Sequence, residues 1–180
     1  MNLEEFIVSS INQSTIEVFS TMLGVELMPG FAIFEEAPDV NCEVVSFIGL
    51  AGPWAGAGSL CCSAALACRV CASMLMTETA SVNEDVLDAV AELTNMVIGN
   101  VKTQLESQLG PLGLSIPTVV YGRNFKTRTA GTADWIILRF HWDEDFLTVK
   151  LCLTPHDKNA RHTIHLFDGA GAISVSVFKQ

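Results

Sequence analysis

Residues 82–109 decide the fold of this chain, and they read VNEDVLDAVAELTNMVIGNVKTQLESQL. Plotted at about 100° per residue, the apolar side chains of this stretch fall on one side and the polar side chains on the other. The apolar side consists of Val86, Leu87, Val90, Leu93, Val97, Ile98, Val101 and Leu105. This periodicity predicts an amphipathic helix that packs one face against a hydrophobic core.

Capping residues mark both ends of this helix. Ser81 and Glu84 have the spacing of a capping box, in which the serine accepts from the glutamate amide and the glutamate side chain returns to the serine. Gly110 and Pro111 follow the last apolar residue, as is typical of a helix C-terminus. We therefore expect a long helix that starts at Ser81 and stops before Gly110.

The polar side of the helix carries two residues that a helix interior disfavours. This side consists of Asp85, Asp88, Glu92, Asn95, Gly99, Thr103 and Glu106. Glu92 and Asn95 are surface neighbours because they lie three residues apart. Asparagine is a poor helix former, and a mid-helix glycine costs about 1 kcal/mol relative to alanine. For Glu92 and Asn95 alone, an ordinary solvated helix face is the favoured interpretation. The mid-helix position of the asparagine, together with Gly99, favours a surface that another backbone approaches closely.

The composition indicates one soluble globular domain. The 180 residues are 49% hydrophobic, and the formal net charge is -10. Such an acidic chain is poorly suited to bind nucleic acid or an anionic membrane, because both need clustered Lys and Arg. No basic segment precedes an apolar run at the N-terminus, so we expect a cytoplasmic protein. Residues 44–60 are apolar but contain several glycines and a proline, so no membrane span is predicted.

The other elements predict an α+β fold. We expect helices over residues 4–23 and 64–76, with Gly24 ending the first, and strands over 42–50, 58–63, 115–121, 133–142, 146–153, 163–167 and 172–178. The first two strands are expected to form a hairpin with a wide loop around 52–56, the next three an antiparallel meander, and the last two an appended hairpin. The expected architecture is a single domain in which an antiparallel β-sheet packs against two long helices and a short helix.

Cysteine and histidine patterns suggest metal or redox chemistry only weakly. Cys68 and Cys71 have CxxC spacing, yet they lie in an apolar helical run without a second pair, so buried thiols are the favoured interpretation. His156, His162 and His165 are close in sequence, but the latter two point to opposite faces of one strand. We predict no metal site in this chain.

Phosphate-binding glycine loops and a nucleophile elbow are also missing from the sequence. A self-contained nucleotide enzyme is therefore disfavoured. Any chemistry is expected to use a reactive group or a metal ion that a partner supplies.

Residues 88–100, DAVAELTNMVIGN, resemble the ExxN signature helix of the CheC/CheX/FliY chemotaxis phosphatases. The single motif and its Asn-Met-x-x-Gly-Asn continuation are most similar to CheX. The order of elements over residues 4–153 agrees with the family as well. The resemblance implies a CheX-like phosphatase domain at residues 1–154 and a C-terminal extension at 155–180, which we expect to add a strand or hairpin to the same domain.

The resemblance implies hydrolysis of the aspartyl phosphate of a CheY-like response regulator. Asn95 would orient the attacking water, and Glu92 would pair with the active-site lysine of the regulator. Asp88, Gly99 and Thr103 would contact the partner, and Asn100 would support the site from the flank. The regulator would bring Mg²⁺, so this chain would bind no cofactor of its own. A homodimer is also implied.

Two other functions remain open from the sequence. A non-catalytic module that binds a response regulator, or a scaffold of the flagellar-switch type, would use the same helix without accelerating hydrolysis. A stand-alone hydrolase of small phosphate esters is less favoured because no metal site is predicted.

Overall fold

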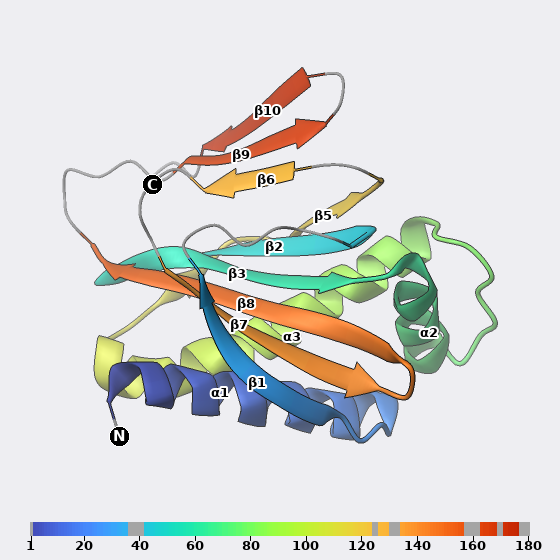
Figure 1. Cartoon of the computed structure of the whole chain (residues 1–180), viewed down its shortest axis with the longest axis horizontal. Helices are drawn as coiled ribbons and strands as arrows, with labels where there is room; N and C mark the ends of the chain where they lie inside the picture. Colours follow the sequence, from blue (N-terminus) through green and yellow to red (C-terminus); the bar gives the residue numbers. More distant parts are fainter. Residues whose placement is uncertain are drawn as a thin grey trace.

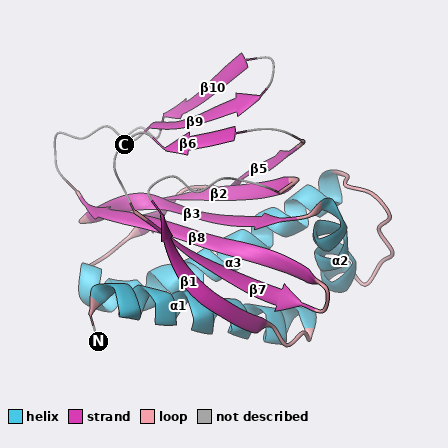
Figure 2. Cartoon of the chain, viewed as in Figure 1, coloured by secondary structure: helices cyan, strands magenta, loops and turns pink. Residues whose placement is uncertain are grey.

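In the part of the chain that this computed structural model describes, three α-helices share one core with an antiparallel sheet (Figures 1 and 2). The structure describes residues 2–35, 42–123, 126–129, 134–156, 163–168 and 171–176. Within these residues the expected α+β architecture is confirmed.

The helices begin and end at residues with clear capping roles. They are α1 (Leu3–Val18), which continues into the π-helix η1 (Phe19–Leu23), α2 (Ala64–Leu75) and α3 (Glu84–Leu109). Asn2 caps α1 through a reciprocal pair of hydrogen bonds with Glu5, at 2.8 and 3.0 Å. Gly24 ends η1 with a φ of +66°, which glycine adopts without steric cost. The predicted first and second helices are therefore confirmed.

The start of α3 differs from the predicted capping box. The N-cap is Asn83 instead of Ser81, and its Oδ1 accepts a hydrogen bond from the Val86 amide at 3.0 Å. Asparagine and serine cap helices about equally well, so the choice between them depends on where the preceding loop leaves the chain. The helix begins at Glu84 and ends before Gly110, as expected at this end.

The main sheet consists of β1 (Met28–Glu35), β2 (Val44–Ala51), β3 (Trp54–Cys62), β4 (Gly113–Leu114), β5 (Thr118–Tyr121), β7 (Trp135–Trp142) and β8 (Asp145–Pro155). The strand order is β1-β7-β8-β3-β2-β4, and β5 also pairs with β2. All of these pairs are antiparallel. The edge that holds β4 and β5 is therefore opposite the edge that holds β1.

The β2–β3 hairpin is tighter than predicted. Only Gly52 and Pro53 separate the two strands, so the expected wide loop is wrong. Gly56, which we assigned to that loop, pairs with Leu50 inside the hairpin. A side chain at Gly56 would collide with the carbonyl oxygen of Cys152 on β8. The glycines of this segment thus permit close strand pairing, which local sequence does not distinguish from a turn.

The predicted three-strand meander is also wrong. β7 and β8 form the expected hairpin through the turn at Asp143 and Glu144, but β5 pairs with β2 instead of β7. No strand is predicted from the sequence at β1, which contains Pro29 and Gly30. β1 tolerates both residues as an edge strand with an irregular register between Pro29 and Ala32.

Side chains of β7 alternate between two apolar layers. Ile136 and Leu138 face the core shared with the helices, whereas Trp135 and Ile137 form a smaller buried cluster with Ala57 and Cys152. A second sheet consists of β6 (Lys126–Thr129), β9 (Thr163–Asp168) and β10 (Gly171–Ser176), in the order β10-β9-β6. Figure 1 places it on the side away from α1. The domain boundary at residue 154 stays a prediction.

Candidate functional site

The helix α3 presents two chemically different faces. Its buried face contacts α1, α2 and the sheet, and it contains Val86, Val90, Leu93, Val97, Ile98, Val101 and Leu105. The other face carries the candidate residues: Asp88, Glu92, Asn95, Asn100 and Thr103 are exposed, and Gly99 is half-buried. The predicted amphipathic pattern is confirmed, and we call the line through Asp88, Glu92, Asn95, Gly99 and Thr103 the polar stripe.

Glu92 and Asn95 lie on a rigid part of the helix. The two residues between them, Leu93 and Thr94, are completely buried. The Thr94 hydroxyl donates to the Val90 carbonyl at 2.7 Å, so this buried polar group is satisfied within the helix. Within the described part of the chain, neither Glu92 nor Asn95 makes a side-chain hydrogen bond or ion pair. Their polar groups are therefore available to a partner.

Internal packing does not explain the glycine at position 99. A Cβ atom there would meet only the Leu114 Cδ1 within 4 Å, at 3.8 Å, among the described residues. By contrast, a Cβ atom at Gly58 would lie 2.8 Å from the Ile98 side chain, so that glycine is needed for the sheet to pack on α3. Gly99 thus lowers the stability of the helix, and no contact among the described residues explains its presence.

Thr103 continues the polar stripe with one hydrogen bond already formed. Its Oγ1 donates to the Gly99 carbonyl at 2.9 Å, which leaves the hydroxyl lone pairs free to accept. Next to Thr103 in the sequence, Lys102 forms an ion pair with Glu106 at 2.8 Å, and Glu106 also accepts from the Leu112 amide at 2.8 Å. Lys102 first, and then this amide, lower the pKa of the Glu106 carboxyl. These contacts hold the chain that leaves α3 against the end of the helix.

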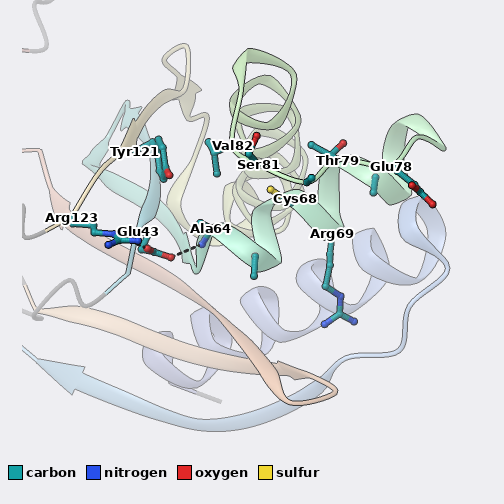
Figure 3. A pocket seen from close by; sticks show the side chains of 13 residues that line it. Glu43, Ala64, Cys68, Arg69, Glu78, Thr79, Ser81, Val82, Tyr121 and Arg123 are labelled. Carbon is teal, nitrogen blue, oxygen red and sulfur yellow. Dashed lines mark hydrogen bonds and ion pairs between the residues drawn. The ribbon is translucent and has the colours of Figure 1, made fainter.

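A separate open pocket lies beside α2, with a volume of about 840 Å³ (Figure 3). Glu43 lines it, accepting from the Ala64 amide at 3.1 Å and pairing with Arg123 at 3.4 Å. Ser81 and Val82, from the loop before α3, and Tyr121 line it as well. The polar stripe residues are not part of its lining. Sequence reasoning missed this pocket because its walls come from segments far apart in the chain.

The arginine on α2 serves a structural role. Arg69 forms ion pairs with Asp143 at 2.7 Å and Asp145 at 3.0 Å, and its guanidinium carbon lies 4.2 Å from the centre of the Trp142 ring. These contacts fasten α2 to the β7–β8 turn. This turn is therefore held by a helix from another part of the chain.

The cysteines and histidines show no assembled site within the described residues. Cys68 and Cys71 are free, buried thiols on α2, which agrees with the favoured interpretation of their spacing. No cluster of three potential metal-binding side chains occurs in the part of the chain that the structure describes. His162 and the side chain of His165 lie outside it. Among the described helices, none combines the length and the apolar character needed to cross a membrane.

Solved structures of similar proteins share this architecture. A CheC-like superfamily protein from Shewanella sp. PV-4 is 27% identical, with a TM-score of 0.75 over 86% of this chain and 99% of the other. CheX from Borrelia burgdorferi, solved in a complex with CheY, BeF₃ and Mg²⁺, is 20% identical. It matches with a TM-score of 0.67 over 82% of this chain and 97% of the other, and supports the fold.

Sequence comparison identifies the family. A curated relative from Thermotoga maritima, named CheY-P phosphatase CheX, is 28% identical over 141 residues, which are 78% of this chain and 91% of the relative. The family model described as "Chemotaxis phosphatase CheX" matches residues 44–141, and this range includes the whole of α3. More than half of the chain is thus matched, and the chain belongs to the CheX family of chemotaxis phosphatases.

Proposed function

We propose that this protein hydrolyses the aspartyl phosphate of a CheY-like response regulator. The observation that carries the proposal is the pair Glu92 and Asn95, exposed side by side on α3 with no internal partner among the described residues. The Thermotoga maritima relative is named a CheY-P phosphatase, which supports the same reaction. Asn95 and Glu92 take different roles in it.

Asn95 positions the attacking water. Phosphoryl transfer requires mainly that the nucleophile be held in line with the phosphorus and that the developing charge be stabilised. The carboxamide of Asn95 can accept from one water proton and donate to a second oxygen, and it carries no charge that would repel the phosphoryl group. Its fixed place on a rigid helix lowers the entropic cost of holding the water.

Glu92 docks the helix on the regulator. Its carboxylate pairs with the active-site lysine of the regulator, and the spacing of three residues brings Asn95 to the phosphoryl group at the same time. Asp88, Gly99 and Thr103 extend the contact along about 22 Å of helix, at 1.5 Å per residue. Asn100 supports this surface from the flank. Gly99 lets the backbone of the regulator approach α3 without a side chain between them.

The Mg²⁺ for this reaction enters with the regulator. An aspartyl phosphate and its neighbouring carboxylates are the oxygen ligands that Mg²⁺ prefers. The Borrelia burgdorferi structure contains Mg²⁺ and BeF₃ together with CheX and CheY. The ion neutralises charge on the phosphoryl oxygens when bound, and Asn95 and Glu92 then act on the water and on the lysine.

We also propose that the chain forms a homodimer. In the described sheet β1 is an edge strand, and Met28 and Phe31 on it are 72% and 95% exposed. An edge with unpaired backbone groups and exposed apolar side chains is a surface that a second strand covers. Sedimentation equilibrium of the native chain tests this, and a monomer at all concentrations would contradict it.

The decisive experiment measures Mg²⁺-dependent phosphate release from a phosphorylated CheY-like receiver. We compare the receiver alone with the native chain, the Asn95→Ala variant and the control variant Gln108→Ala, which removes an exposed carboxamide elsewhere on α3. We expect acceleration by the native chain and the control, and its loss in folded Asn95→Ala. If the native chain binds receivers from its own organism but accelerates none of them, the scaffold function replaces the phosphatase.

A further inference from the structure

An exposed isoleucine lies on the short connection between β4 and β5. Ile116 is 87% exposed, although isoleucine is among the residue types most often buried. The large apolar side chains of neighbouring Leu114 and Val119 pack against the main core instead. Ile116 is therefore left out of the core by the geometry of this segment.

The backbone on both sides of Ile116 is fixed to β2. Leu114 pairs with Leu50, and Thr118 pairs with Phe47. Between them, the Ser115 amide donates to the Gly49 carbonyl at 2.9 Å, and the Gly49 amide donates to the Ser115 hydroxyl at 2.8 Å. Pro117 restricts the backbone of this connection further, because its ring fixes the φ angle. The connection therefore holds Ile116 in the solvent in a fixed position. A partner that covers this side chain loses little free energy to ordering the loop.

One contact and one shared pocket wall place this connection along α3. The Leu114 side chain lies 3.8 Å from the position of a Cβ atom at Gly99, and Tyr121 shares the pocket wall with Val82, as Figure 3 shows. The segment from Leu114 to Tyr121 thus runs antiparallel to α3. Ile116 lies between these two points in the segment, and Glu92 and Asn95 lie between the same two points in the helix.

We propose that Ile116 is an apolar docking contact for the phosphorylated receiver on α3. This inference rests on the proposed function. The receiver surface then carries a cation facing Glu92 and an apolar side chain facing Ile116. A receiver is favoured over a second copy of this chain because Ile116 adjoins the polar stripe, whereas the strand edge assigned to the dimer, β1, lies at the opposite end of the sheet.

The test is the affinity of the native chain and its variants for a CheY-like receiver with BeF₃ and Mg²⁺, measured by calorimetry together with KM and kcat for hydrolysis. We expect Ile116→Ala and Ile116→Asn to weaken binding about tenfold, because each removes apolar area that becomes buried only on binding. Ile116→Leu restores native affinity because it restores the apolar volume. The kcat stays native in all three variants, because Ile116 does not reach the phosphoryl group.

Phe146→Ala is the matched control, since Phe146 is an exposed apolar residue on β8, outside both the polar stripe and the β1 edge assigned to the dimer. It leaves the affinity for the receiver unchanged. Native affinity in Ile116→Asn, or an equal loss in Phe146→Ala, overturns the inference. An affinity loss at Ile116 without hydrolysis by the native chain supports the docking contact and overturns the phosphatase. If the native chain does not bind any receiver, both proposals are overturned.

Discussion

The two faces of α3 differ in what their residues contribute to the stability of the helix. On the buried face, apolar side chains fill the core. Ile98 packs so closely on β3 that only glycine fits at position 58. On the exposed face, Asn95 and Gly99 weaken the helix, and no contact among the described residues compensates for either. Residues that cost stability without an internal reason are candidates for recognition by a partner.

The largest expected effect lies on the buried face. Leu93→Ala removes a completely buried side chain next to Glu92 and should lower the free energy of unfolding by about 2–5 kcal/mol. Urea denaturation measures this. The hydrolysis rate per folded molecule should stay close to native, because the change points into the core. A variant with native stability would show that this face is not the core contact.

Asn95→Ala should give the reverse result. We expect a loss of about 10²-fold in the stimulated hydrolysis rate, as for removal of a positioned polar group in other active sites. The free energy of unfolding should not fall, since Asn95 is exposed and alanine is the better helix former. Asn95→Asp should be at least as impaired because it adds a negative charge beside the phosphoryl group. Measurable activity near the native rate in either variant would remove Asn95 from the mechanism.

Glu92→Gln should weaken binding more than catalysis. Loss of the ion pair with the receiver lysine should raise KM about tenfold, with a smaller change in kcat. Salt screens exposed ion pairs, so KM of the native chain should rise more steeply with ionic strength than KM of the variant. Equal salt dependence in the two proteins would argue that Glu92 does not contact a cation.

Alanine substitutions at Gly99 and Gly58 should give the smallest effects, and these effects should have opposite signs in the free energy of unfolding. Gly99→Ala should raise the free energy of unfolding by about 0.5–1 kcal/mol, because the new methyl group meets only ordinary contacts. Its KM should still rise a few-fold as the receiver backbone is held away. Gly58→Ala should lower the free energy of unfolding by about 1–3 kcal/mol, because the methyl group collides with Ile98. Thermal and urea unfolding of both variants, with KM values, separate these outcomes.

Local sequence determined more of the site than of the sheet. The polar stripe follows from spacings of three and four residues on one helix, so Glu92, Asn95 and Gly99 could be grouped without any knowledge of the fold. The motif around them also carried the resemblance to the family, which the comparisons confirm. The roles of these residues stay predictions.

Tertiary structure decided which segments lie next to that stripe. Whether Ser81 or Asn83 caps α3, whether β5 pairs with β2 or β7, and whether the segment around Gly56 is a turn or a strand all depend on contacts between residues distant in the chain. The side of the sheet on which β4 and β5 lie places Ile116 beside α3 and forms the pocket beside α2. Sequence alone therefore determined the helix and its polar face, because helical periodicity is local. The surroundings of that face required the fold, because strand pairing is not local.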